Sequence, residues 1–530
     1  MHRMVEAFIP LLSQEIGEPV APVFGRDRIC GVVAAEDAAT MLQQLAEGVQ
    51  HTSVLELRLD WLPSLSEIRR FLAMVGVIRT TLPGFSENTL VATCRRRAAG
   101  GKFRGSVGEQ LRILRAAVEA GCSWVDLEIE SFSGFRNGQV ENLLGRSQCL
   151  VSYHDFRRVP ANLRAIVRRL RHQDADAIKI AVQARTFADA ARLLHLAEGQ
   201  RDVVAVPMGD TAFPARILML KHGSALAYAA VENATAPGQI SLEEMKGLYR
   251  AHRTDAGTRI YGVIGNPVGH SLSPRMHNAG FEASGMNAVY LPFNVPNLGD
   301  FLGVVRSFGL EGFSVTLPHK RRIIKYIHRC DPIAAAIGAV NTVVVGPGGN
   351  LSGYNTDYLG IQRALENRMV LAKSRTLILG AGGAARAAAF ALTQAGAGVR
   401  ICARRAGEAR KLAHLVKGQA VPRSALRRED FDLIVNATPV GMHPHEDGSP
   451  LAVEELNARF VFDLIYRPRT TRLMQLAAKR GIETISGVEM FVAQGLAQWE
   501  IWTGCKAPVK AMRQAVETAL ESEEKARADV

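Results

Sequence analysis

The sequence has few cysteines, and they form no pattern that would crosslink a small fold or bind a structural metal. Its 530 residues include seven cysteines, scattered from Cys30 to Cys505, and none of them forms a Cys-x-x-Cys pair. The odd number argues against a disulfide framework, and the missing pairs argue against a structural zinc site. Most of these cysteines lie in apolar, strand-like runs, which is typical of buried thiols in a reducing compartment.

Long apolar runs are also missing. No stretch approaches the roughly 20 apolar residues that a membrane-spanning helix needs. The N-terminal segment MHRMVEAFIPLLSQEIGE combines a short apolar run with acidic residues, a pattern that fits neither a secretory signal nor a transit peptide. We therefore expect a cytoplasmic protein with no membrane partner.

Acidic residues are in deficit, since 64 Lys and Arg face 51 Asp and Glu and the net charge is +13. Such an excess favours anionic partners. The basic residues are dispersed, and neither zinc-finger spacing nor an aromatic-rich ribonucleoprotein motif is present, so small anionic substrates or cofactors are favoured over nucleic acid. The chain is too long for one hydrophobic core, and about two to four domains are expected.

In the first half, short apolar runs alternate with amphipathic segments of helical periodicity. The eight strand candidates are residues 29–35, 54–61, 89–95, 124–130, 149–156, 177–182, 203–208 and 226–231. Eight strands alternating with helices predict a parallel (β/α)8 barrel over residues 28–254, after an N-terminal extension at residues 1–27. An open, doubly wound sheet is the alternative.

A second α/β region begins after a polar linker near residues 254–258. The runs RIYGVIG, AVYLPFNV, LEGFSVTLPHK and AVNTVVV predict strands of one lobe over residues 255–360. A strand, a glycine turn, a helix and a further strand then predict a Rossmann-type lobe over residues 361–487. Residues 488–530 are expected to form helices that return to the first lobe and to end in the charged tail ESEEKARADV, frayed in solution.

The glycine turn LILGAGGAARAAAFAL has the spacing G-x-G-x-x-A. Because it directly follows a strand and opens an alanine-rich helix, its backbone can approach a pyrophosphate whose charge lies at the helix N-terminus. We expect dinucleotide binding by Gly380, Ala381, Gly382, Gly383 and Ala384.

The next strand ends at Ala403, Arg404 and Arg405. A lobe that binds NAD usually has Asp or Glu here for the ribose hydroxyls, whereas arginine suits the 2′-phosphate of NADP. These residues favour NADP(H) over NAD(H). The alternative is that the two arginines only begin a solvated helix.

The stretch GHSLSPRMHN sets Ser271 and Ser273 just before Pro274, where a helix can begin. The two hydroxyls could cap that helix. They could instead hold an anion, because the free N–H groups and the dipole of a helix start favour negative charge. The residues alone leave both interpretations open.

In the barrel half, Lys179 lies in the apolar strand AIKIAV, and His154 ends the preceding strand. Burial disfavours a charged lysine, so we expect a neutral, nucleophilic amine. A histidine beside it at the carboxyl ends of barrel strands could move a proton next to a carbonyl. A buried Lys–Asp pair and a structural histidine are the alternatives.

The second half resembles shikimate dehydrogenase in seven successive motifs, GNPVGHSLSPRMHN, SVTLPHK, GAVNTV, GYNTDYLG, GAGGAARA, NATPVGM and GVEMFVAQG. This resemblance implies a two-lobed α/β dehydrogenase in which Ser271 and Ser273 bind the carboxylate of shikimate. Lys320 and Asp357 match the catalytic pair, which orients a carbonyl oxygen and relays a proton to it; a plain salt bridge is the alternative. The resemblance further assigns ring hydroxyls or carboxylate to Thr316, Asn341, Tyr466 and Gln494, and the nicotinamide side to Thr438, Leu464 and Gly487.

The barrel half resembles type I 3-dehydroquinate dehydratase in ELRLD, ATCRRRAAGGKF, SYHDF, IKIAV and ATAPGQI. By this resemblance Lys179 forms an imine with the substrate ketone and His154 moves the adjacent proton. The imine is the electron sink, so no metal is expected. The substrate binders that the resemblance implies are Glu56, Arg58, Arg95, Arg216, Thr235 and Gln239.

Four positions depart from these families. Ala99 replaces a glutamate that orients the histidine, and Thr235 replaces a serine. In the second half Ser314 replaces an asparagine, and ARR at residues 403–405 replaces NRT, which makes the cofactor preference less secure than the chemistry.

Together the halves imply a bifunctional enzyme that dehydrates 3-dehydroquinate and reduces the resulting 3-dehydroshikimate with NADPH. One alternative is a fusion that prefers quinate. Another is a metabolite-sensing regulator similar to the fungal quinate-pathway repressor, which would be expected to lose catalytic residues that are present here.

Overall fold

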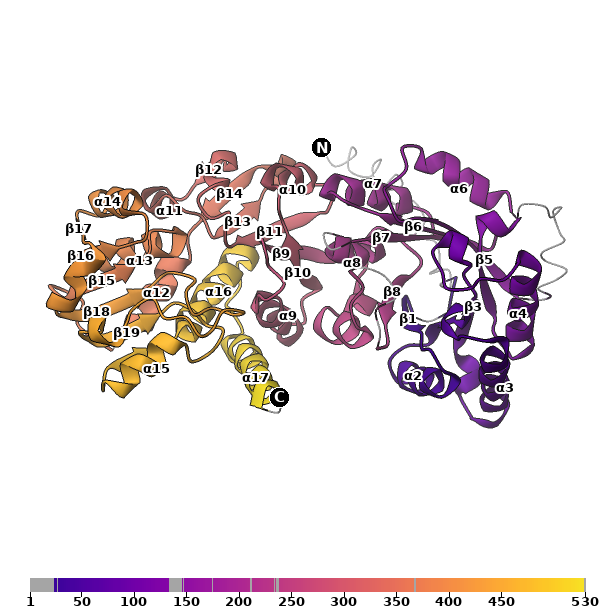
Figure 1. Ribbon diagram of the computed structural model, residues 1–530. Coiled ribbons are helices and arrows are strands. Elements are labelled where there is room, and N and C mark those ends of the chain that lie inside the picture. The colour runs from indigo at the N-terminus through magenta and orange to yellow at the C-terminus, as the bar shows by residue number, and fades with distance from the viewer. Residues whose placement is uncertain are drawn as a thin grey trace, which may run out of the picture. The chain divides into compact units, whose positions relative to one another are not determined.

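The computed structural model describes residues 23–528 except 26, 133–144, 146, 174, 210–211, 233, 235–237 and 367. The chain divides into two compact units, built mainly from residues before and after the boundary between Ala256 and Gly257. Each unit contains its own parallel β-sheet with helices packed against it (Figure 1). Within the described residues no helix is long and apolar enough to cross a membrane.

The first unit is a parallel barrel, as predicted. Its eight strands pair in the order β7-β6-β5-β4-β3-β2-β1-β8. Between β7 and β8 the backbone N–H of Ala225 donates to the carbonyl of Val203 at 2.9 Å, which brings the two edges together. The strands are β1 Ile29–Val33, β2 Val54–Arg58, β3 Thr89–Thr93, β4 Trp124–Glu128, β5 Gln148–Asp155, β6 Ala177–Gln183, β7 Val203–Met208 and β8 Ala227–Ala230.

Helices follow the strands because the loops supply capping side chains. Asp37 accepts from the N–H of Thr40 at the start of α2, and Ser106 forms a capping box with Glu109 at the start of α4. The described α-helices of this unit are α2 Ala38–His51, α3 Leu65–Thr81, α4 Val107–Glu119, α6 Leu163–Arg171, α7 Phe187–Ala197 and α8 Phe213–Lys221.

An aromatic pair contributes to the core of the barrel. The ring of Phe24 lies 4.2 Å from that of Trp124, centroid to centroid, and Phe24 is only 2% exposed. Both rings belong to one buried apolar cluster with side chains from the barrel strands. Phe24 therefore packs with the barrel, although it precedes residue 28, where the sequence placed the start of that domain.

The second unit contains two sheets, of which the first is mixed. Its order is β10-β9-β11-β13-β14-β12, with β9 parallel to β10 and β11, and β13 antiparallel to β11 and β14. Its strands and helices are β9 Arg259–Gly265, α9 Ser273–Ala283, β10 Ala288–Asn294, α10 Leu298–Val304, β11 Leu310–Val315, β12 Arg329–Cys330, α11 Pro332–Ile337, β13 Thr342–Val345 and β14 Leu351–Tyr354.

The second sheet is wholly parallel, with the order β17-β16-β15-β18-β19-β20. The strand order reverses at β15, and such a switch point is where dinucleotides bind in Rossmann-type folds. Its elements are α12 Asp357–Leu365, β15 Arg375–Leu379, α13 Gly383–Gln394, β16 Gly398–Cys402, α14 Ala406–Leu415, β17 Gln419–Ala420, β18 Phe431–Asn436, β19 Ala458–Asp463, α15 Arg472–Lys479 and β20 Glu483–Ile485.

Two C-terminal helices return to the first lobe (Figure 1). Side chains of α16 (Gly487–Thr503) and α17 (Val509–Ala528) join α9 and β9 in one buried apolar cluster that includes Tyr261 and Trp499. Helix α17 continues into the charged tail as far as Ala528, and its Glu523 pairs with Arg467 at 2.7 Å.

We expect Phe24→Ala to destabilise the barrel by about 3–5 kcal/mol, since it removes a buried aromatic ring and leaves a cavity beside Trp124. Hydrogen exchange of the barrel strands in the full chain, followed by mass spectrometry, measures the change within this unit. The matched control is Val77→Ala on α3, because Val77 is 54% exposed and such surface changes stay within about 0.5 kcal/mol. Equal exchange in both variants would contradict the packing role of Phe24.

Candidate active sites

In the barrel, Lys179 of β6 is buried against two carboxylates. Its Nζ lies 3.1 Å from Oε1 of Glu56 and 3.1 Å from Oδ2 of Asp126, and 3.9 Å from the ring centroid of Tyr228. The amine expected from an apolar strand therefore lies between two carboxylates, which are placed to compensate a charge on it. A buried Lys–Asp pair, the alternative left open by the sequence, is present together with a Lys–Glu pair.

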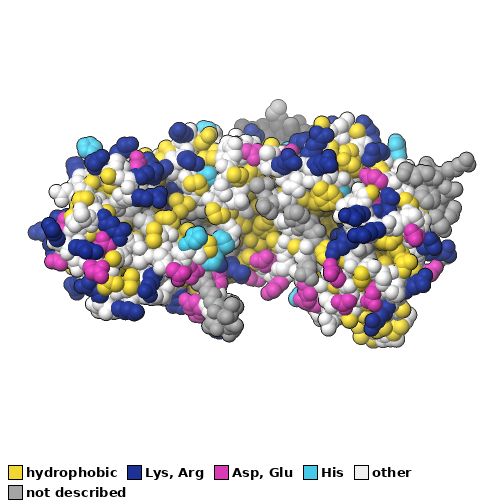
Figure 2. Space-filling view, viewed as in Figure 1, with side chains coloured by type: hydrophobic (Ala, Val, Ile, Leu, Met, Phe, Trp, Pro, Cys, Tyr) yellow, Lys and Arg dark blue, Asp and Glu magenta, His cyan; other side chains and the backbone are white. Residues whose placement is uncertain are grey.

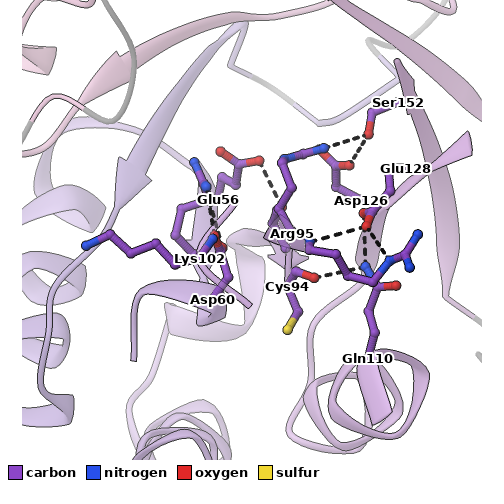
Figure 3. Close-up of polar contacts among 12 residues, drawn as sticks. Glu56, Asp60, Cys94, Arg95, Lys102, Gln110, Asp126, Glu128 and Ser152 are labelled. Carbon is purple, nitrogen blue, oxygen red and sulfur yellow. Dashed lines mark hydrogen bonds and ion pairs between the residues drawn. The ribbon is translucent and has the colours of Figure 1, made fainter. Parts of the chain in front are cut away.

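Asp126 of β4 is the centre of this cluster, and sequence reasoning missed it. Its carboxylate accepts from Arg95 Nη2 at 2.7 Å and from Ser152 Oγ at 2.6 Å (Figure 3). It also accepts from Lys179 Nζ at 3.1 Å. Burial alone would raise the pKa of Asp126, but Arg95 and Lys179 outweigh burial and hold the pKa below its ordinary value. Asp126 is thus an anion that compensates two buried cations. The available signal was an acidic residue inside a buried strand, WVDLE, which needs a partner.

Arg95 connects this cluster to His154. Its Nη1 lies 3.0 Å from His154 Nδ1 and 3.0 Å from Ser152 Oγ. Because a guanidinium only donates, Nδ1 accepts and the imidazole is neutral. Burial, Arg95 and Lys179 lower the pKa of His154 well below its ordinary value. The structure therefore presents His154 as a neutral base, linked through Arg95 to the lysine cluster.

Ala99 lies in the loop after β3, in the short helix Arg97–Ala99, and is 8% exposed. The next two glycines are tightly enclosed: Gly100 has φ +81° beside Phe156, and a Cβ on Gly101 would lie 2.0 Å from the carbonyl of Arg95. The Phe156 ring stacks on that of His154 at 6.0 Å. Residue 99 is an alanine, and His154 is held by the contact with Arg95 and stacked by Phe156.

The remaining predicted residues of the barrel site are Arg58, Arg216, Thr235 and Gln239. Arg58 forms two hydrogen bonds with Asp60, each 3.0 Å long. Arg216 on α8 is buried, its Nε donates to the carbonyl of Pro207 at 3.1 Å, and burial lowers its pKa to about 10. Gln239 is half-buried, and Thr235 lies outside the described residues. A buried guanidinium such as that of Arg216 suits an anionic ligand.

In the second unit, Lys320 and Asp357 form the predicted pair. Lys320 Nζ lies 2.5 Å from Asp357 Oδ2, and Asn341 Nδ2 donates to Asp357 Oδ1 at 2.9 Å. Asn341 Nδ2 is also 3.4 Å from Gln494 Oε1 on α16. Both carboxylate oxygens are therefore held, and four of the predicted residues meet at one point.

The lysine of this pair also contacts the glycine turn of the other lobe. A Cβ built on Gly383 would lie 3.0 Å from Cβ of Lys320. In the same turn Gly380 has φ +110°, and a Cβ there would lie 3.0 Å from the carbonyl of Ala437, so only glycine fits. Gly382 and Gly383 begin α13 without a side-chain cap, and Ala381 and Ala384 are half-buried. This cradle fits a pyrophosphate at a helix N-terminus.

Ser271 and Ser273 lie at the start of α9. Ser271 Oγ accepts from the N–H of Ser273 at 3.2 Å, and the N-cap residue Leu272 makes no side-chain cap. Burial raises the pKa of Tyr466, and a hydrogen bond to the Ser271 side chain partly offsets that effect. One local bond thus resembles capping, while Tyr466 adds a further hydroxyl beside the first turn of α9.

Ser314, which departs from the family pattern, is part of a buried hydrogen-bond chain. Its Oγ lies 2.6 Å from the hydroxyl of Tyr290 and donates to Gln498 Oε1 at 2.8 Å. Gln498 Nε2 in turn donates to the carbonyl of Asn341 at 3.2 Å. Ser314 therefore makes hydrogen bonds to both Tyr290 and Gln498, and Gln498 connects it to the backbone of Asn341.

The other predicted residues follow strand ends of the two sheets. Thr316 follows β11, and its N–H donates to the carbonyl of Ile264. Thr438 and Leu464 follow β18 and β19, and Gly487 begins α16. Arg404 and Arg405 are exposed between β16 and α14. Figure 2 shows lysine and arginine scattered over the visible face and interspersed with acidic side chains, without one continuous basic surface. Among the described residues, no group of three or more His, Cys, Asp or Glu could hold a metal ion.

Comparisons with known proteins cover both units. A family model described as type I 3-dehydroquinase matches residues 29–256. Models described as shikimate dehydrogenase substrate binding domain and shikimate 5'-dehydrogenase C-terminal domain match residues 263–343 and 487–517.

Curated relatives give the same division. The chain is 33% identical over 505 residues to the bifunctional 3-dehydroquinate dehydratase/shikimate dehydrogenase, chloroplastic, of Arabidopsis thaliana, covering 91% of this chain and 82% of that protein. It is 42% identical over 280 residues to the shikimate dehydrogenase (NADP(+)) of Moorella thermoacetica, covering 50% of this chain and 95% of that protein. The corresponding protein of Methanosarcina acetivorans is 41% identical over 278 residues, with coverage of 50% and 99%.

We expect Asp126→Asn to destabilise the barrel by about 3–5 kcal/mol, because it leaves buried Arg95 and Lys179 without their shared anion. The matched control is Asp202→Asn, which breaks the ion pair with Arg171 between side chains 36% and 41% exposed and should cost less than about 1 kcal/mol. Hydrogen exchange of the barrel strands measures both effects. Similar losses in the two variants would refute the buried charge cluster.

Proposed function

The chain belongs to the family of bifunctional 3-dehydroquinate dehydratase/shikimate dehydrogenases, and we propose that its two units catalyse consecutive steps of the shikimate pathway. The barrel dehydrates 3-dehydroquinate, and the second unit reduces the product, 3-dehydroshikimate, to shikimate with NADPH. One observation carries this proposal: each unit brings a lysine into contact with carboxylates, Lys179 with Glu56 and Asp126 in the barrel and Lys320 with Asp357 in the second unit. The predicted domain boundaries, the cytoplasmic location and the absence of a nucleic-acid partner stay predictions.

In the barrel, Lys179 is proposed to attack the ketone. The ammonium must first lose a proton, and the carboxylate of Glu56, 3.1 Å from Nζ, is placed to accept it while Asp126 stays an anion. The amine then adds to the carbonyl carbon, and loss of water gives an imine that withdraws electrons from the neighbouring carbon. Neutral His154 removes the proton on that carbon and returns it to the departing hydroxyl. Hydrolysis of the imine releases the product and restores Lys179.

In the second unit, bound NADPH supplies the hydride to the carbonyl carbon. Lys320 is proposed to donate a proton to the developing alkoxide, while Asp357 orients the ammonium and shares that proton. Asn341 supports the arrangement because its amide holds the second oxygen of Asp357. The substrate carboxylate is proposed to bind at Ser271, Ser273 and Tyr466. Thr316 and Gln494 are proposed to bind ring hydroxyls.

The glycine turn and the two exposed arginines support NADP(H) as the cofactor. The pyrophosphate would be held at Gly380–Ala384, and Arg404 and Arg405 would bind the 2′-phosphate. The regulator alternative is not favoured, since His154, Lys179, Lys320 and Asp357 are all present. Oxidation of shikimate compared with quinate tests the remaining alternative.

The full chain should oxidise NADPH when it is given 3-dehydroquinate, followed by the loss of NADPH absorbance. Lys179→Ala should abolish this reaction, with a fall of about 10³-fold or more, because no other group can form the imine. The same variant should still oxidise NADPH when 3-dehydroshikimate is supplied, since that substrate enters after the dehydration.

The complementary variant is Lys320→Ala. It should consume 3-dehydroquinate and accumulate 3-dehydroshikimate without oxidising NADPH. Failure of the wild-type chain with both substrates would reject the enzyme proposal and favour the regulator. If the wild-type chain oxidises NADPH with 3-dehydroshikimate but not with 3-dehydroquinate, only the barrel is inactive. Ala99 departs from the family pattern in that unit.

Replacing both arginines, in Arg404→Gln with Arg405→Gln, should raise the KM for NADPH about 10–100-fold, because charge-assisted bonds to the 2′-phosphate are lost. The KM for NADH should change by less than about 3-fold, since NADH lacks that phosphate. Arg410→Gln on α14, the helix that follows the two arginines, is the matched control, because Arg410 is exposed. An equal rise in the KM for NADPH and the KM for NADH would show that the two arginines do not bind the 2′-phosphate.

A further inference from the structure

Two buried polar side chains end the neighbouring strands β18 and β19. Asn436 is the last residue of β18, Asp463 is the last residue of β19, and the two are partners in the strand register. Both have 0% exposure. A carboxylate removed from water in this way has to be compensated by donors, so its contacts identify what it holds in place.

Asp463 receives hydrogen bonds from three separate segments. Its Oδ1 accepts from Asn436 Nδ2 at 3.0 Å and from the backbone N–H of Ile465 at 3.1 Å. Its Oδ2 accepts from Thr471 Oγ1 at 2.6 Å, and Thr471 caps α15. These three donors are neutral, and burial raises the pKa of the Asp463 carboxyl to about 6. Above that pH the site is a buried anion held by neutral groups.

The contact with Asn436 leads to the loop after β18. Asn436 Oδ1 accepts from both the backbone N–H of Thr438, at 3.0 Å, and its Oγ1, at 2.7 Å. Thr438 Oγ1 then accepts from the N–H of Val440 at 3.3 Å. This loop carries the backbone that is proposed to line the nicotinamide. Its conformation is therefore set through Asn436 by the orientation of Asp463.

The contact with Ile465 leads to the loop after β19. Ile465 directly precedes Tyr466, whose ring stacks on Phe491 with centroids 4.1 Å apart and whose hydroxyl contacts Ser271. Tyr466 is proposed to bind the substrate carboxylate. One oxygen atom, Oδ1 of Asp463, therefore holds both the nicotinamide loop and the start of the loop that presents the tyrosine.

We propose that Asp463 is a positioning residue that couples cofactor binding to substrate binding in the dehydrogenase unit. When a ligand orders one loop, it also fixes the orientation of Asp463. The second ligand then pays a smaller entropic cost to order the other loop, which gives positive cooperativity. This inference rests on the proposed dehydrogenase function. It names a residue outside the set expected from the motifs.

The test is a binding measurement on the full chain with NADPH and shikimate. These two ligands cannot react with each other, because both are in the reduced form. NADPH fluorescence gives the Kd for NADPH with and without saturating shikimate, and their ratio is the coupling factor. We expect a coupling factor of about 5 or more for the wild-type chain.

Two variants of the carboxylate separate its role from packing. Asp463→Ala removes both oxygens, so the coupling factor should fall to about 1. Asp463→Asn keeps one acceptor for Asn436 and Ile465 and can donate to Thr471, so it should retain most of the coupling. Rescue by this conservative variant is a result that a merely structural role would not require.

Two further variants test each end of the chain of contacts. Asn436→Ala breaks the link to Thr438 while leaving Asp463 in place, so it should lose the coupling and carry the test if Asp463→Ala fails to fold. Thr471→Val removes the Oδ2 bond and the cap of α15 but leaves both Oδ1 bonds. It should lower stability and keep the coupling factor.

The inference is overturned if the wild-type chain binds both ligands without coupling, or if Asp463→Ala and Asn436→Ala keep the wild-type factor. It is also overturned if Thr471→Val loses coupling as fully as they do, because packing alone would then explain the effect. A wild-type chain that binds neither ligand would instead reject the proposed dehydrogenase function, so the two failures are distinguishable.

Discussion

Charge compensation around a lysine that is buried in the barrel and half-buried in the second unit is the constraint on which both units depend. An ammonium can remain inside a protein only where anions and donors replace the water it loses. In the barrel, Lys179 and Arg95 are compensated by Glu56 and Asp126, which come from different strands. The barrel must therefore close in the correct register before this cluster is neutral. The same ion pairs therefore set the geometry around Lys179 and stabilise the order of the barrel strands.

The second unit solves the same problem with fewer charges. Lys320 is paired with Asp357, and neutral amides complete the shell, since Asn341 holds the carboxylate and Gln494 lies beside that amide. The lysine comes from the loop after β11, and its stem lies against Gly383 of the opposite lobe. Reaction geometry here depends on the packing of two lobes, whereas in the barrel it depends on one closed sheet. This difference explains why α16, which contributes Gln494, joins the cores of both lobes.

Much of the fold could be predicted because apolar runs of strand length are a local property. All eight barrel strands were expected within a few residues, and the glycine turn identified the switch point of the second sheet. The motif residues were found by resemblance. Asp126 lies in the middle of β4 and Asp463 is the last residue of β19; both were missed because their strands look ordinary in sequence, and only the neighbouring segments reveal what each carboxylate holds. The contacts of Phe24 and of the charged tail were missed for a related reason: their partners, Trp124 and Arg467, are distant in sequence.

The return of the last two helices to the first lobe has a consequence for synthesis on the ribosome. The barrel strands are complete once residue 230 has emerged, so this unit can form its core while the remainder is still being made. The sheet that begins at β9 cannot do the same, because Trp499, Met512 and Leu520 belong to its apolar cluster. That cluster stays incomplete until residue 520 has been synthesised. The two units thus differ in the time for which their nascent apolar surfaces are available to chaperones.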